Sequence, residues 1–151
     1  MTTFATRETI RDGLVTLFTA NNSWKAVYGY IPKVTTIDGK SPLLVITSAG
    51  TDQNMAGLNT NPTEYTFTFV SFVRMDDSVS GGTWGEDDAE DKLDELDTVF
   101  RQVVRDNAGG GSFADALMFA DTQSRTDYAM IDGVGYRTEE WILSAHHYSG
   151  A

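Results

Sequence analysis

The sequence contains no cysteine, and this absence excludes several kinds of chemistry. A disulfide, a thiolate nucleophile and a cysteine-built zinc or iron–sulfur site are all ruled out. Histidine is scarce as well, since the only two, His146 and His147, are adjacent near the end of the chain. Neighbours on a strand point to opposite faces, so we do not expect these two rings to meet at one metal ion.

Positive charge is also in short supply. The chain carries 22 Asp and Glu against 11 Lys and Arg, which gives a formal net charge of -11. A nucleic-acid reader needs a basic stripe, so this balance disfavours sequence-specific binding to DNA or RNA, and it equally disfavours anionic membranes. Apolar runs such as 116–120 are far below the roughly 20 residues that span a bilayer, and residues 1–8 lack the pattern of a secretory signal. We therefore expect a protein made in a cytoplasm that enters no membrane.

Two stretches repeat apolar residues at helical spacing. The first helix is predicted over 6–20, with Thr6 as its N-cap and an Asn pair at 21–22 as its stop. The second is predicted over 86–107, where acids crowd the first half and Arg101 and Arg105 the second, as the helix dipole favours. Within 151 residues, we expect one domain that covers the whole chain.

Other stretches have the alternation and the β-branched or aromatic content of strands. The strongest is 65–73, whose later half, around 70–72, is expected to be covered on both sides. The five predicted strands cover 25–31, 43–47, 65–73, about 115–124 and 134–147, and the first two are expected to form a hairpin. The predicted fold is α+β, in the order α-β-β-β-α-β-β, with two helices packed on one side of an antiparallel or mixed sheet of about five strands. The residues predicted to be buried are Leu14, Leu17, Phe18, Phe67, Phe69, Leu93, Leu96, Phe100, Val103, Trp141 and Leu143.

Two connections, 50–63 and 75–85, are too long for simple turns. Both are rich in Gly, Asn, Asp and Ser, yet they contain the large apolar residues Met55, Leu58, Val79 and Trp84. These four are the candidate residues for self-association or for contact with a partner. Trp84 has two readings, because it can pack onto the start of the second helix or serve as an interface anchor.

No pattern in the chain indicates catalysis. The glycines at 109–111 follow a helix and lack a lysine, so they are read as a helix stop and not as a phosphate loop. The acids from 86 to 97 are read as a solvated helix face. One alternative places Asp76, Asp77, Glu139 and Glu140 around a divalent ion, which requires distant segments to converge. We predict no enzyme activity, no cofactor and no metal site.

The whole arrangement resembles the tail terminator, or tail completion, proteins of long-tailed bacteriophages. The resemblance lies in the size, the element order and several segments, namely the opening helix with 9–14, the strand entry 42–46, the aromatic strand 65–73, the long second helix and the closing strand that ends in residues 146–148. It rests on element order and includes no short diagnostic motif, so no functional residue is carried over.

The resemblance implies a structural virion subunit in the tail–neck region, assembled in the host cytoplasm. Such proteins form a hexameric ring that caps the tail tube, ends its polymerisation and joins the tail to the head. The implied partners are other copies of the chain, the tail tube protein and a head completion (neck) protein, with DNA passing through the ring. Two alternatives remain open, which are another neck or head–tail joining protein and a small soluble ligand-binding module.

Overall fold

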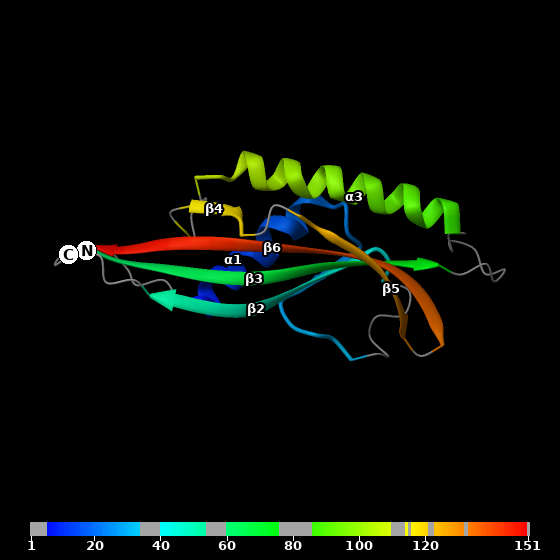
Figure 1. Cartoon of the computed structure of the whole chain (residues 1–151), viewed down its shortest axis with the longest axis horizontal. Helices are drawn as coiled ribbons and strands as arrows, with labels where there is room; N and C mark the ends of the chain where they lie inside the picture. The colour runs from blue at the N-terminus through cyan, green and yellow to red at the C-terminus, as the bar shows by residue number, and fades with distance from the viewer. Residues whose placement is uncertain are drawn as a thin grey trace.

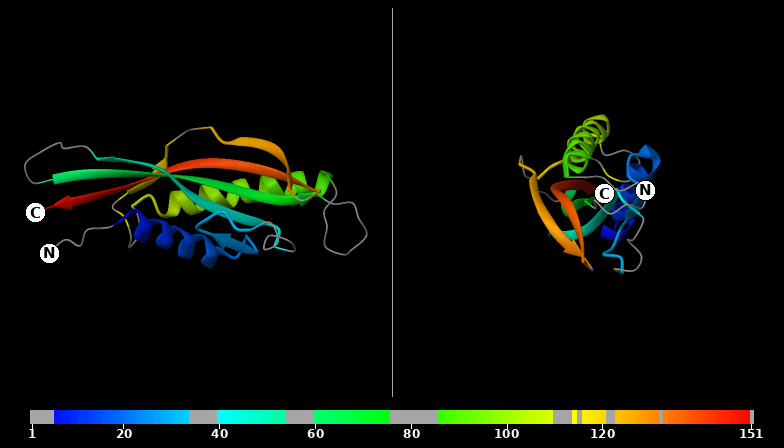
Figure 2. Two further views of the ribbon diagram at one scale, coloured as in Figure 1. Left: turned by 90° about the horizontal axis from the view of Figure 1, so that it is seen from below. Right: turned by 90° about the vertical axis from the view of Figure 1, so that its right-hand side faces the viewer.

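The computed structural model describes residues 6–33, 40–53, 60–75, 86–109, 114, 116–120, 123–131 and 133–150. Its helices are α1 (Arg7–Asn21) and α3 (Glu86–Asp106). Its strands are β1 (Ala26–Tyr28), β2 (Leu43–Gln53), β3 (Thr60–Met75), β4 (Ala116–Phe119), β5 (Arg125–Ile131) and β6 (Val134–Gly150). The elements follow the predicted order with one extra strand, and they build one mixed sheet with both helices on one of its faces (Figures 1 and 2). The α+β prediction is confirmed.

The strands lie in the order β1-β2-β3-β6-β4, and β5 pairs with the same edge of β6 as β4 does. All pairs are antiparallel except β1 with β2. The predicted hairpin of these two strands is therefore wrong. The connection from 29 to 42 is long enough for the chain to return and start β2 beside the start of β1, as parallel pairing requires.

The strand predicted over 115–124 is also wrong in its extent. In its place β4 pairs with residues 143–146 of β6, and β5 pairs with residues 134–140. The prediction of one strand failed because the long strand β6 pairs along one edge with two short strands, β4 and β5. The predicted loop 50–63 likewise proves too long, since β2 continues to Gln53 and β3 already begins at Thr60.

Local signals explain where α1 begins and ends. The Thr6 hydroxyl accepts a hydrogen bond from the backbone N–H of Thr9 at 3.1 Å, which satisfies one of the free donors at the helix start. Asn22 closes the other end with a left-handed φ of 64°. In between, Ile10, Leu14 and Phe18 are fully buried against the sheet.

The main core lies between the two helices and the sheet. Phe100 of α3 is at its centre, where its ring stacks on Trp141 of β6 at 4.1 Å between centroids and on Phe18 of α1 at 5.0 Å. It also meets the edges of Phe69 and Trp24. All the residues predicted to be buried are buried, except Leu17, which is half-buried at the margin of this core.

We predict that Phe100→Ala lowers the free energy of unfolding by about 3 to 5 kcal/mol, because it removes a ring that three elements pack against. Chemical denaturation followed by tryptophan fluorescence measures the change. Gln102→Ala, two residues further along and exposed, is the matched control and should change stability by less than about 0.5 kcal/mol. Equal stability of the two variants would contradict the placement of Phe100.

Candidate functional site

A second apolar cluster lies on the sheet face that the helices leave uncovered. Leu43 and Val45 of β2 and Tyr136 of β6 are buried there, and Phe72 of β3 packs edge-on against the Tyr136 ring at 6.2 Å. This placement follows from strand alternation, because residues on either side of these in sequence face the helices. The prediction that the later half of 65–73 is covered on both sides is met only on the helix face, because Val70 and Phe72 on this face are only partly buried.

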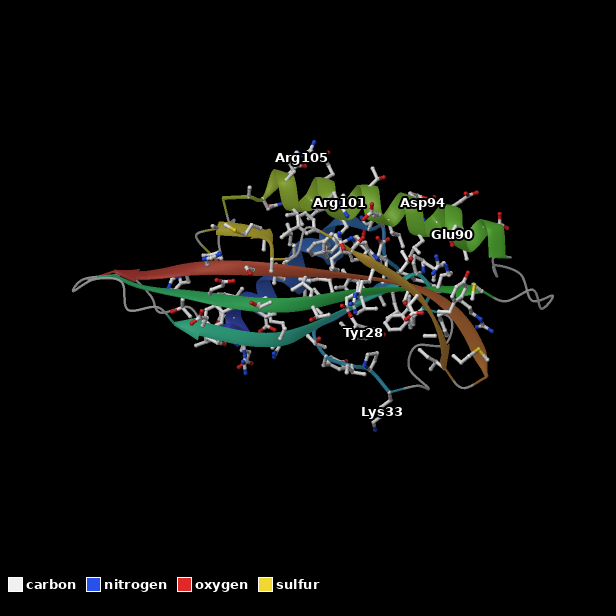
Figure 3. All side chains as sticks on the ribbon, in the orientation of Figure 1. Tyr28, Lys33, Glu90, Asp94, Arg101 and Arg105 are labelled. Carbon is white, nitrogen blue, oxygen red and sulfur yellow. The ribbon has the colours of Figure 1, made fainter. Side chains whose placement is uncertain are left out.

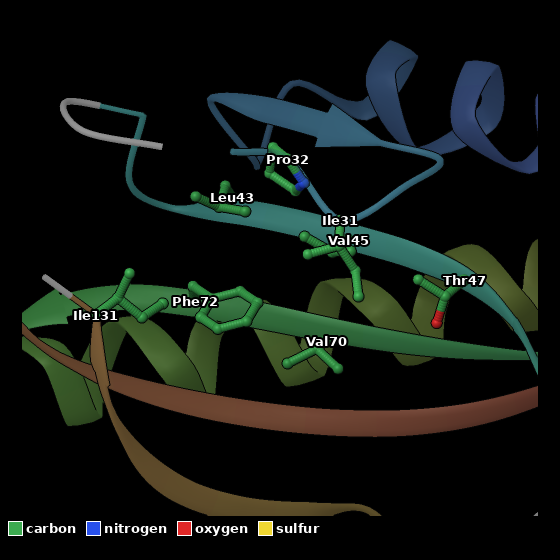
Figure 4. Close-up of a pocket in the computed structure, with 8 residues that line it drawn as sticks. All are labelled: Ile31, Pro32, Leu43, Val45, Thr47, Val70, Phe72 and Ile131. Carbon is green, nitrogen blue, oxygen red and sulfur yellow. The ribbon is translucent and has the colours of Figure 1, made fainter. Parts of the chain in front are cut away.

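Leu43, Val45 and Phe72 of this cluster form the floor of an open apolar groove of about 310 Å³ (Figure 4). Strands β2 and β3 supply the floor, Ile31 and Pro32 form one wall after β1, and Ile131 at the end of β5 forms the other. The lining residues are Ile31, Pro32, Leu43, Val45, Thr47, Val70, Phe72 and Ile131. Thr47 is the only polar residue among these lining residues, so the groove suits apolar groups.

The wall after β1 is held in place by a close approach to α1. At Gly29 an added Cβ would lie 3.1 Å from the Val15 side chain, so a larger residue would push the chain away from the helix. Beyond it, Tyr30 and Ile31 are exposed, Ile31 to 80% of its surface. The groove therefore has a large apolar rim in contact with solvent, which a monomer does not need for folding.

A buried carboxyl group lies on the other face of the sheet, under α3. Glu139 of β6 is only 5% exposed and accepts a hydrogen bond from the Ser124 hydroxyl at 2.7 Å. Nearby, Asp97 of α3 accepts hydrogen bonds from Arg101 at 3.0 Å and from the Trp141 indole at 2.9 Å. The carboxyl of Glu139 thus belongs to a polar network that joins the helix, the strand and the segment before β5.

Burial is the main cause that raises the pKa of Glu139 to about 7. The Asp97 carboxylate raises this pKa further, whereas the bond from Ser124 and the charge of Arg101 lower it. The sequence analysis considered Glu139 only as a ligand in the divalent-ion alternative and did not predict its burial. The apolar spacing of the strand around Trp141 was the available signal, because Glu139 is on the same face as that buried ring.

The alternative of four acids around a divalent ion is tested only in part. Glu139 and Glu140 point to opposite faces of β6, so these two do not converge, and Asp76 and Asp77 lie outside the described residues. His146 and His147 also lie at successive positions of β6 and face opposite ways, as expected. Among the residues that the structure describes, no three His, Asp or Glu side chains gather where they could hold a metal ion.

The four predicted contact residues, Met55, Leu58, Val79 and Trp84, lie outside the described residues, so their role stays a prediction. The groove was not anticipated from the sequence. Of its residues, the apolar pair at 31–32 and the two-sided strand around residue 72 carried the only signal. None of the described helices has the length and hydropathy needed to cross a bilayer.

Comparison with known proteins assigns no function to this site. No protein-family model matches the chain, and no curated protein matches its sequence.

The pKa of Glu139 leads to a prediction about pH. The group has a higher pKa in the folded state, about 7, than its ordinary value of 4.5, so the unfolded chain loses this proton first as pH rises. The contribution of Glu139 to the free energy of unfolding therefore falls by on the order of 2 to 3 kcal/mol between about pH 4.5 and pH 7. We predict that Glu139→Gln removes this loss and makes the protein more stable than wild type at pH 8.

Chemical denaturation at pH 5 and at pH 8 tests this expectation. Glu140→Gln is the matched control, since it changes the neighbouring acid on the opposite face of the same strand. The idea fails if Glu139→Gln and Glu140→Gln have the same dependence of stability on pH.

Proposed function

We propose that this chain is a structural subunit that assembles with copies of itself into a ring of the tail terminator kind. The observation that carries the proposal is the open apolar groove with its exposed rim, because Tyr30 and Ile31 contribute little to the fold of a single subunit. Large apolar residues at a sheet surface are typical of protein–protein contacts. The sequence resemblance specifies the kind of assembly.

Free sheet edges give further support. The outer edge of β5 runs over seven residues with no partner strand among the described residues. Five of these seven residues are exposed. On the opposite side of the sheet, β1 covers only the first three residues of β2. An uncovered strand edge readily accepts another chain, so a stable monomer usually protects it.

In this proposal the ring caps the tail tube, ends its polymerisation and connects it to a head completion (neck) protein in the tail–neck region of the virion. The subunit assembles in the host cytoplasm, has no enzymatic role and needs no cofactor. Its net charge of -11 suits a ring through which DNA passes, because an acidic lumen repels phosphates and does not retain them. A hexamer is the number that the resemblance implies.

The groove also favours a second candidate, a small ligand-binding module. A volume of about 310 Å³ and a nearly uncharged lining match the small end of pockets that hold apolar ligands. The two functions differ in particle size, because a module of this kind remains a monomer or dimer in solution.

The ring proposal predicts that the purified protein forms a closed oligomer, measured by light scattering at low and high salt, with and without tail tube protein. High salt should favour the ring, since it screens repulsion between subunits of charge -11. Ile31→Asp should reduce the oligomer, because it places a charge in an apolar contact. Leu58→Asp and Trp84→Ala should impair tail assembly if the two loops also contribute.

Thr16→Asp is the control, because Thr16 is exposed on α1 and far from the groove in sequence. A monomer under every one of these conditions would reject the ring. Saturable binding of an apolar dye by that monomer, lost in Ile31→Asp, would favour the ligand-binding module.

A further inference from the structure

We infer that the groove of one subunit receives the edge strand β5 of the neighbouring subunit, with Met130 entering the groove. This inference rests on the proposed ring and names the contact between its subunits. The occupant is a second copy of this chain. Three features of the described residues support it. They are the apolar groove, the exposed apolar side chain of Met130 on β5, which is the projection, and charges of opposite sign beside the groove and the projection.

The projection lies on β5. Met130 is 74% exposed and Tyr128, on the same side of the strand, is also exposed. Ile131, by contrast, lines the groove of its own subunit. Because successive side chains of a strand point to opposite faces, Met130 turns away from that groove and is free to enter another. The groove and the projection are therefore two different surfaces of one chain.

Charge complementarity supports a second copy as the occupant. Two of the four lysines, Lys33 and Lys40, lie close in sequence to groove-lining residues, and both are exposed. Lys33 follows the groove wall directly, while Lys40 comes three residues before Leu43 on its floor. These two lysines bring positive charge next to the groove in a chain whose net charge is -11.

Acidic side chains accompany the projection. Glu90 of α3 binds Arg137 through two hydrogen bonds of 2.7 and 3.0 Å, and the Arg137 guanidinium lies 4.4 Å from the centre of the Tyr128 ring. Asp94 lies one turn further along the same side of α3. Figure 3 shows Lys33 on the opposite side of the molecule from Glu90 and Asp94. Arg125, the exposed cation of β5, is at the other end of the strand from Met130.

This arrangement decides the symmetry of the contact. A groove on one side and a projection on another make a heterologous, head-to-tail contact, which closes into a ring when the rotation per subunit divides a full turn. A two-fold dimer that placed one groove against the other would instead bring Lys33 and Lys40 of the two copies together, and these like charges would repel. The placement of charge thus disfavours a groove-to-groove dimer.

Engineered cysteines test the contact directly, because the natural chain has none and every disulfide formed is the intended one. Ile31→Cys and Met130→Cys are purified separately as reduced proteins, mixed under assembly conditions and oxidised with copper phenanthroline. A disulfide requires Cβ atoms about 4 Å apart, so only a close contact reacts efficiently. We expect a cross-linked dimer in the mixture and little in either protein alone.

The matched control is Met118→Cys mixed with Ile31→Cys. Met118 is also an exposed methionine on a strand at the edge of β6, 47% exposed, but it lies on β4. The control mixture should not cross-link above the level of the single proteins. The double variant Ile31→Cys/Met130→Cys should give a ladder of covalent oligomers that ends at the ring number.

Charge reversal provides an independent measurement on the same contact. Lys33→Glu should weaken association about tenfold, and Asp94→Lys in the same chain should restore it, as expected for two exposed charges of opposite sign at one interface. The contact would be overturned, and the ring would stand, if oligomers form but Ile31→Cys and Met130→Cys do not cross-link. The same holds if the Met118→Cys control cross-links equally well. A monomer under all conditions would overturn both.

Discussion

The stack of Phe100 on Trp141 is the interaction on which the rest of this structure depends. Their rings are nearly parallel, 8° apart, and they join the centre of α3 to the centre of β6. Phe18 stacks on the other side of Phe100, so the same ring also holds α1 in place. Because aromatic side chains contribute much of the buried area in a core of this size, both helices pack on one face of the sheet.

This one-sided packing has a consequence for the opposite face. Two helices cover one side of a sheet whose middle strands are apolar on both sides near Phe72 and Tyr136. No further helix is available in the described part of the chain to cover the second cluster, and the segment after β1 covers it only in part. The groove is therefore the part of a two-sided apolar sheet that a one-sided helix layer leaves open.

The polar network at Glu139 lies beside this core and is tied to it by the indole of Trp141, which donates to Asp97. The same ring that packs against Phe100 thus orients a carboxylate next to a buried acid. Arg137, two residues earlier on β6, holds Glu90 of α3 and the backbone carbonyl of Asp127 on β5. The pKa of Glu90 is lowered and that of Arg137 is raised by the hydrogen bonds between them, so this pair stays charged. These contacts keep β5 beside α3 and present its outer edge.

The sequence by itself determined the elements that depend on local periodicity. The two helices, the cap at Thr6, the strand around Phe69 and ten residues of the core could be predicted, because apolar residues at steps of three and four or of two reflect which face is buried. Tertiary structure alone decided the parallel pairing of β1 with β2, the sharing of one β6 edge by β4 and β5, the groove, and the burial of Glu139. Each of these brings together residues that are distant along the chain, and periodicity within one segment carries no information about which other segment will lie beside it.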